Sequence, residues 1–325
     1  MHEEFLSLDH IKQAKERISP FINRTRLIRA ETLDGILNCN VYLKPEMLQK
    51  TGAFKFRGAL NTVFMLDDEI RKKGIITSSS GNHGQACAYI GKMLGIPVTV
   101  VLPDDTPQIK IERTKKYGAE IILEDRSYEK RWIRVQQEVD KYGYTVIHPY
   151  ENFNVMAGQG TIGLEILEDL PYVDKVVVPV GGGGLISGIS TAIKSINPKI
   201  KVIGIEPEAS APYIESRKQH KRVSVGNTPT IADGLSTRQA GDNTYPIIEK
   251  NVDELIGVDE ESIKRAVKLI ASNAKLVAEP SACVGIAAVL SGKLNFSVNE
   301  NVVFVLTAGN WDIDKIGKIL NDEEL

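Results

Sequence analysis

Four consecutive glycines constrain the fold of this chain more than any other feature of its sequence: Gly181, Gly182, Gly183 and Gly184. They follow a β-branched apolar run at 175–180 and precede a second apolar segment that begins at Leu185. This order predicts a strand, a glycine loop and a helix. Residues without Cβ let the backbone approach a ligand closely, and the amides of a helix N-terminus bind anions. Because a tight turn needs only one or two glycines, the run favours a phosphate-binding loop.

The chain lacks the motifs that bind the phosphates of nucleotides. No Gly-x-x-x-x-Gly-Lys-Ser/Thr pattern occurs in the chain, which excludes a P-loop at the level of sequence. One Gly-x-Gly-x-x-Gly pattern occurs at 158–163, but residues 149–157 separate it from the nearest preceding strand candidate, 144–148. A dinucleotide-binding fingerprint follows its strand directly. We therefore interpret 158–163 as close packing at the start of a helix.

Composition excludes several classes of partner. The chain has 325 residues, of which 42% are hydrophobic and 25% charged, and a formal net charge of −2. This balance gives no basic field for nucleic acid. The N-terminus lacks the apolar run of a signal peptide and no segment reaches membrane-spanning length, so we expect a cytoplasmic protein without a membrane partner. Cys39, Cys87 and Cys283 fit neither a disulfide framework nor a zinc site, and are expected to be core thiols.

The order of the predicted elements indicates an α/β protein. Strand candidates at 75–78, 98–102, 121–123 and 144–148 alternate with helix candidates at 83–94, 107–117 and 128–141. A second series contains a helix at 161–167, the glycine-loop unit and further elements at 202–206, 260–273, 282–290 and 302–306. Such alternation predicts parallel sheets covered by helices. We expect two domains, a large cofactor-binding one (1–73 and 149–325) and a small substrate-closing one (74–148), with a ligand cleft between them.

Lys55 is the candidate nucleophile. It stands between Phe54 and Phe56, where desolvation would lower the pKa of its amine and favour formation of a Schiff base. A lysine considered alone is usually a solvated surface group. However, a lysine in an apolar setting, combined with a separate, non-nucleotide phosphate loop, is what a pyridoxal phosphate enzyme requires.

Over nearly its whole length, the chain resembles the fold-type II pyridoxal phosphate enzymes. These enzymes have a tryptophan synthase β-like fold and include serine/threonine dehydratases and serine racemases. The segments 51–59, 79–85, 181–184 and 307–310 are similar to the motifs of that family. The resemblance implies that Lys55 is the Schiff-base residue and that Asn82 meets the 3′-oxygen of the cofactor. It also implies cofactor contacts from Phe54, the four glycines, Leu185 and Thr307.

The same resemblance implies a substrate site around the loop at 79–84. Ser79, Ser80, Asn82 and His83 are expected to bind the substrate carboxylate, with Ser80 as a second acid/base on the face opposite Lys55. From the residues alone, this loop could equally be a simple cap of the following helix. Arg131 matches an arginine that helps to hold substrate in racemases, and is otherwise read as a solvated helix residue.

Several residues depart from the commonest family pattern. Ala53 stands where serine is frequent, and Thr307 stands where serine or cysteine is frequent. A hydroxyl at Thr307 suits a neutral pyridine nitrogen, and such a ring favours prompt loss of a β-substituent. In racemase relatives a divalent cation lies near the segment that matches Glu206 to Pro212. Because Pro212 occupies the place of an acidic ligand, the sequence argues against a metal ligated by Glu206.

The resemblance implies an ammonia-lyase that acts on a small hydroxy amino acid, L-threonine or L-serine, and works as a homodimer. It also implies the absence of a C-terminal regulatory domain, since the chain ends soon after Thr307. Serine racemase with side elimination activity and 3-hydroxyaspartate ammonia-lyase are the alternatives. A catalytically silent ligand-binding protein could keep the glycine loop but would need no lysine at position 55.

Overall fold

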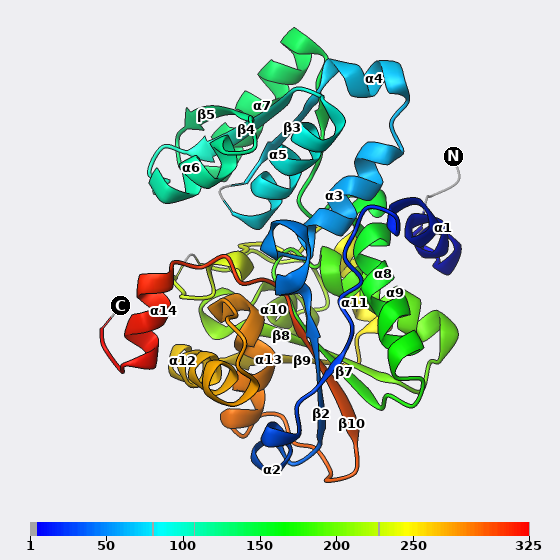
Figure 1. The fold of residues 1–325 in the computed structure, drawn as a ribbon, viewed down its shortest axis with the longest axis vertical. Helices are drawn as coiled ribbons and strands as arrows, with labels where there is room; N and C mark the ends of the chain where they lie inside the picture. Colours follow the sequence, from blue (N-terminus) through cyan, green and yellow to red (C-terminus); the bar gives the residue numbers. More distant parts are fainter. Residues whose placement is uncertain (1–4, 80, 107, 227, 325) are drawn as a thin grey trace.

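A computed structural model describes residues 5–79, 81–106, 108–226 and 228–324 of the chain. Within these residues the strands form one six-stranded and one four-stranded sheet (Figure 1). The six-stranded sheet has the order β1-β2-β10-β7-β8-β9, and its neighbouring strands are parallel except for β1 and β2. The four-stranded sheet has the order β5-β4-β3-β6 and is parallel throughout.

The strands of the six-stranded sheet are β1 (Ile28–Arg29), β2 (Asn40–Pro45), β10 (Asn301–Leu306), β7 (Lys175–Pro179), β8 (Lys201–Pro207) and β9 (Glu254–Val258). Those of the four-stranded sheet are β5 (Glu120–Glu124), β4 (Val98–Pro103), β3 (Ile75–Ser78) and β6 (Thr145–Val146). The helices of the first half are α1 (Leu8–Ile18), α2 (Asp34–Leu37), α3 (Lys55–Phe64), α4 (Asp68–Lys73), α5 (Asn82–Leu94), α6 (Gln108–Lys115), α7 (Tyr128–Tyr142) and α8 (Phe153–Asp169). Those of the second half are α9 (Gly184–Ile196), α10 (Pro212–Lys218), α11 (Thr244–Asn251), α12 (Glu260–Leu269), α13 (Pro280–Leu290) and α14 (Ile313–Leu320).

Helices cover both faces of the six-stranded sheet. Along β10, Val302 and Phe304 pack in one buried cluster with residues of α12 and α13. The alternate residues Val303 and Val305 pack in a second cluster with residues of α8 and α9. Since both faces are buried, the strand is a continuous apolar run, without the alternation of a half-exposed strand. The expected α/β class, with parallel sheets covered by helices, is confirmed.

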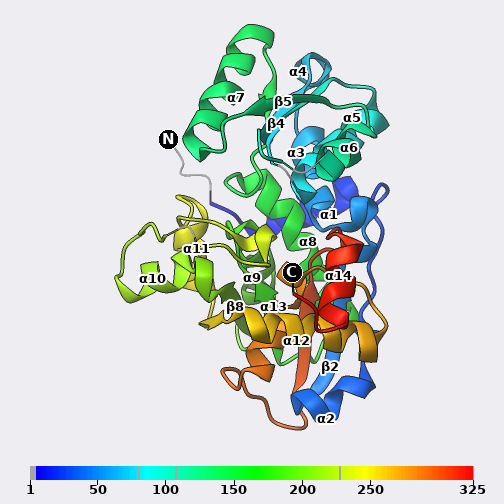
Figure 2. The same cartoon turned by 90° about the vertical axis from the view of Figure 1, so that its left-hand side faces the viewer.

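The two sheets lie in different halves of the molecule. In both views, the four-stranded sheet and α4 to α7 occupy one half, while α12 to α14 occupy the other (Figure 1 and Figure 2). The segment that follows β6 leads back into α8, which packs against α3 and α9. The carboxyl ends of β3, β7 and β10 are therefore connected to the loops that meet between the halves.

The predicted helix at 161–167 is longer than expected and corrects our interpretation of the glycines at 158–163. Helix α8 begins at Phe153 because the Asn152 side chain accepts hydrogen bonds from the amides of Asn154 and Val155. The glycines thus lie inside the helix and not at its start. Their role in close packing is confirmed, since a Cβ at Gly158 would lie 2.6 Å from the Cα of Gly58 in α3.

A buried ionic network fixes α3 against α8 and β2. The Arg57 guanidinium donates hydrogen bonds to both carboxylate oxygens of Glu46, with the Nε–Oε2 distance at 2.8 Å, and Nη1 donates to Glu165 at 2.7 Å. The Lys44 ammonium also donates to Glu165, at 2.5 Å. All four side chains are almost fully buried. The network therefore holds the start of α3, where Lys55 lies, at a defined place.

The cysteines and the lengths of the helices can be compared with the sequence. Cys39, Cys87 and Cys283 are free and buried, as expected of core thiols. None of the helices in the described parts of the chain is long and apolar enough to cross a membrane.

Candidate active site

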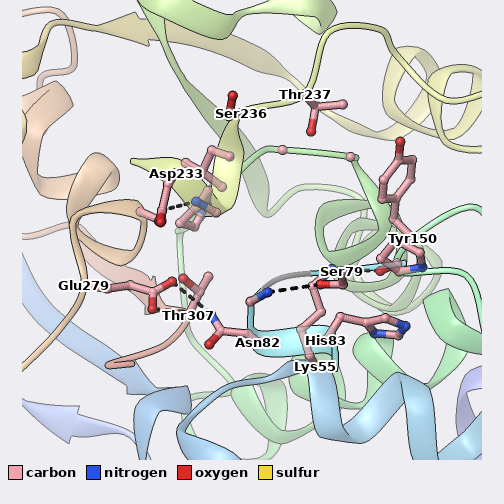
Figure 3. Close-up of a pocket in the computed structure, with 18 of the residues that line it drawn as sticks. Lys55, Ser79, Asn82, His83, Tyr150, Asp233, Ser236, Thr237, Glu279 and Thr307 are labelled. Carbon is pink, nitrogen blue, oxygen red and sulfur yellow. Dashed lines mark hydrogen bonds between the residues drawn. The ribbon is translucent and has the colours of Figure 1, made fainter. Parts of the chain in front are cut away.

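A cavity of about 620 Å³ lies between the two sheets, and loops from both of them form its walls (Figure 3). The side of the six-stranded sheet contributes the glycine loop, Thr307, Glu279 and a loop around Asp233. The other side contributes the start of α5, and Lys55 lies at the start of α3. The cavity thus brings together most of the residues that the sequence singled out: Phe54, Lys55, Ser79, Asn82, His83, Gly181, Gly182, Gly183, Gly184, Leu185 and Thr307.

The glycine loop connects β7 to the N-terminus of α9. Gly183 has a φ of +84°, a conformation that favours glycine. A Cβ at Gly182 would lie 2.2 Å from the Tyr150 ring, and a Cβ at Gly183 would lie 2.4 Å from the Tyr213 hydroxyl. That hydroxyl donates a hydrogen bond to the Gly182 carbonyl at 2.8 Å. The loop is therefore packed so closely that side chains are excluded, while the N-terminus of a 13-residue helix faces the cavity.

Lys55 is the first residue of α3 and its amine lies in the cavity. Its Nζ donates a hydrogen bond to the Pro149 carbonyl at 2.7 Å. Desolvation by burial lowers the pKa of the Lys55 amine to about 8. The preceding residue, Phe54, donates its amide to the Thr307 carbonyl at 3.1 Å, which ties the lysine to the end of β10. The arrangement presents an amine that is partly neutral near physiological pH.

The loop between β3 and α5 supplies polar groups on the other side of Lys55. The Ser79 hydroxyl accepts a hydrogen bond from the Gly81 amide at 3.4 Å. The His83 imidazole contacts the Ile147 carbonyl through Nε2 at 2.9 Å, so Nε2 carries a proton. Burial lowers the pKa of His83 to about 3 and keeps the ring neutral. Ser80 lies outside the described residues, and its assignment stays a prediction.

Glu279 is a cavity residue that the sequence did not single out. It directly precedes Pro280, the first residue of α13, so its sequence context suggests only a helix start. In the structure its carboxylate accepts a hydrogen bond from the Asn82 carboxamide at 3.0 Å. No sequence signal could have found this contact, because the two residues are 197 positions apart.

Arg131 and Thr307 differ in how they relate to the cavity. Thr307 directly follows β10, is 4% exposed and lines the cavity. Arg131 lies on α7, where its Nη1 donates to the Ser78 hydroxyl at 3.0 Å and its guanidinium lies over the Tyr128 ring. Arg131 does not line the cavity as formed by the described residues. Its substrate contact therefore stays a prediction.

Glu206 does not have the surroundings of a metal ligand. Its two carboxylate oxygens accept hydrogen bonds from the amides of Tyr213 and Ile214, at 3.0 and 2.8 Å, in the first turn of α10. The carboxylate thus satisfies backbone amides at the start of α10, which begins with Pro212. In the parts of the chain that the structure describes, no three His, Cys, Asp or Glu side chains gather in one place. The surroundings of Glu206 therefore do not fit a divalent cation, because both of its oxygens already accept hydrogen bonds from backbone amides.

Comparison with known proteins agrees with this geometry. Residues 18–308 match the family described as pyridoxal-phosphate dependent enzyme. The chain is 43% identical to the L-threonine ammonia-lyase of Thermotoga maritima over 97% of its own length and 78% of that protein.

Solved structures of serine racemases share the fold. Maize serine racemase superposes with a TM-score of 0.93 at 36% identity, covering 98% of each chain. The serine racemase of Dictyostelium discoideum superposes with a TM-score of 0.89 at 38% identity, covering 94% of this chain and 99% of that one. The expected fold type is therefore confirmed, and so is the cofactor class that the lysine and the glycine loop indicated. The chain belongs to the family of pyridoxal-phosphate dependent enzymes.

Proposed function

We propose that this enzyme is an ammonia-lyase that converts L-threonine to 2-oxobutyrate, and L-serine to pyruvate, with release of ammonia. The observation that carries this choice of reaction is the 43% identity to the L-threonine ammonia-lyase over nearly the whole chain. The cavity supports it, because a lysine with a lowered pKa faces polar groups suited to a carboxylate.

The residues of the cavity fit pyridoxal phosphate. The amides of the glycine loop would hold the phosphate at the N-terminus of α9. The Thr307 hydroxyl would meet the ring nitrogen, the Asn82 carboxamide the ring oxygen, and Lys55 the carbonyl carbon. When bound, pyridoxal phosphate withdraws electrons from the α-carbon of the amino acid.

The chain itself supplies the proton transfer and the orientation of substrate. In its neutral form the Lys55 amine accepts the α-proton. The Ser79 hydroxyl and the start of α5 bind the substrate carboxylate, which sets the direction of the α-proton toward Lys55. The neutral His83 imidazole adds no charge to this subsite.

Replacing Gly182 by valine is expected to weaken pyridoxal phosphate binding by about ten- to a hundredfold. The added Cβ would lie 2.2 Å from the Tyr150 ring, so that the loop must shift, and overpacking of this kind costs about 1–3 kcal/mol. Equilibrium dialysis measures the dissociation constant. Gly317→Val is the matched control, since a Cβ at Gly317 meets open space. Unchanged affinity in Gly182→Val would mean that the loop is only a turn.

Serine racemase is the second candidate, favoured by the TM-score of 0.93 with the maize enzyme. Both candidates are tested by incubating the purified holoenzyme with L-threonine, L-serine and 3-hydroxyaspartate. We expect keto acid to form from L-threonine and L-serine faster than D-serine forms from L-serine. D-serine formation that exceeds pyruvate formation would instead establish a racemase. A preference for 3-hydroxyaspartate would establish a 3-hydroxyaspartate ammonia-lyase.

The domain division, the oligomeric state and the location of the protein complete the proposed function. We propose that 74–148 form a small domain that closes on substrate, and that 1–73 with 149–325 form a large one. The separation of the four-stranded sheet from the six-stranded sheet supports this division. We further propose a homodimer in the cytoplasm. Light scattering of the purified protein tests the first of these, and a monomer would contradict it. Fractionation of cells tests the second, and a membrane-bound protein would contradict it.

A further inference from the structure

Glu279 is a buried carboxyl in the cavity with a role not yet assigned. It occupies the N-cap position of α13, yet its side chain makes no capping hydrogen bond there. Instead the carboxylate points into the cavity beside Thr307 and Asn82 (Figure 3). Only 5% of the residue is exposed. Burial of a carboxyl is costly unless its contacts compensate, so these contacts require an explanation.

The contacts of Glu279 define the orientation of the Asn82 carboxamide. Asn310 Nδ2 donates to two acceptors, the Thr51 carbonyl at 2.6 Å and Asn82 Oδ1 at 2.8 Å. Asn82 must therefore present its oxygen to Asn310 and its NH₂ group to Glu279, where the Nδ2–Oε1 distance is 3.0 Å. Glu279 Oε2 also accepts a hydrogen bond from the backbone N–H of Asn310 at 3.2 Å. Each of these bonds to Glu279 uses the carboxylate as an acceptor.

These bonds cross from one half of the molecule to the other. Asn82 begins α5, which packs with the four-stranded sheet. Glu279 and Asn310 lie on either side of β10, on segments that belong with the six-stranded sheet. The carboxylate thus joins the two walls of the cavity.

We propose that Glu279 is a positioning residue that, as a carboxylate, holds the Asn82 carboxamide across the cavity with an N–H directed at the ring oxygen of the cofactor. This inference rests on the proposed binding mode of pyridoxal phosphate. A protonated carboxyl would hold Asn82 less well, because both of its partners are donors.

The charges around Glu279 make its protonation state sensitive to pH near neutrality. Burial and the nearby Asp233 carboxylate raise the pKa of Glu279 to about 7, opposed by the bonds from Asn82 and Asn310. Lys110 of α6 also opposes the rise, but its ammonium is paired with Asp233 at 2.9 Å. Cys283 of α13 is a neutral thiol, since burial and Glu279 raise its pKa.

The test compares the pyridoxal phosphate dissociation constant of Glu279→Gln with that of the wild type between pH 5.5 and pH 8. The ratio at each pH cancels the ionisations of the cofactor and of Lys55. Because a hydrogen bond to a charged group is stronger than one to a neutral group, we expect a ratio of about ten at pH 8. The ratio should approach one at pH 5.5, where the wild-type carboxyl is protonated. A ratio near one at pH 8 overturns the proposal.

Thermal unfolding of the apoprotein is a second readout. A carboxyl whose pKa is raised in the folded state stabilises the fold below its unfolded pKa, and this stabilisation is lost as pH rises from about 4.5 to about 7. The wild-type Tm should therefore fall more between pH 5 and pH 8 than the Glu279→Gln Tm. Parallel changes of the two Tm values would show that Glu279 does not change its protonation state over this range, which would contradict the predicted pH dependence.

Asp233→Asn keeps the proposal testable if Glu279→Gln fails to fold. Removing the neighbouring negative charge lowers the pKa of Glu279, so the pH at which cofactor affinity changes should also become lower. The exposed Glu261→Gln on α12 is the matched control and should show no such change. An unchanged profile in Asp233→Asn overturns the proposal. If the wild type binds no pyridoxal phosphate, the proposed function itself fails, which is a separate outcome.

Discussion

Replacing Lys55 by alanine is expected to reduce keto acid formation more than about a thousandfold while the protein still folds, because the proposed mechanism assigns both the covalent link and the base to this one side chain. The amine lies in the cavity, and the Pro149 carbonyl is its hydrogen-bond partner in the structure. Truncation therefore removes a functional group and little packing. Turnover with L-threonine and the absorbance of the bound cofactor measure the effect.

Lys50→Ala is the control for this substitution. Lys50 lies five positions earlier, and its ammonium lies over the Phe56 ring. We expect the Lys50 variant to retain the cofactor spectrum and the Lys55 variant to lose it, with similar unfolding temperatures. A Lys55→Ala enzyme with full turnover and an unaltered spectrum would remove Lys55 from the proposed role.

Replacing Arg57 by methionine is expected to destabilise the apoprotein by about 3–5 kcal/mol, since it leaves Glu46 and Glu165 buried with much of their compensating charge removed. Urea unfolding measures the change as a lower midpoint. Arg71→Met is the matched control. Its partner Asp68 is largely exposed, and surface pairs contribute only about 0–1 kcal/mol. Equal midpoints for the two variants would show that the buried network does not stabilise α3.

Features of local sequence were predictable because a short segment determines them. The apolar run before Gly181 predicts a strand, and the four glycines predict the loop that the structure places between β7 and α9. The predicted strand at 75–78 coincides with β3, since it begins with two isoleucines and ends at a polar loop. The apolar setting of Lys55 predicts a lowered amine pKa, and the structure gives the same direction.

Features that depend on distant contacts were not predictable. The Glu279 carboxylate meets Asn82 only because the start of α13 and the loop after β3 lie at one cavity. The start of α8 was placed too late, because the glycines at 158–163 suggested a boundary that the Asn152 cap moves to Phe153. Likewise, the contact of Arg131 with Ser78 depends on the packing of α7 against β3.

Borohydride reduction of the holoenzyme, followed by peptide mapping with mass spectrometry, tests the central claim most directly. Reduction fixes the cofactor to the lysine that holds it. We expect the pyridoxyl group on the peptide that contains Lys55 and on no other peptide. A label on another lysine, or cofactor released without attachment to the chain, would contradict the assignment of Lys55 and the mechanism proposed from it.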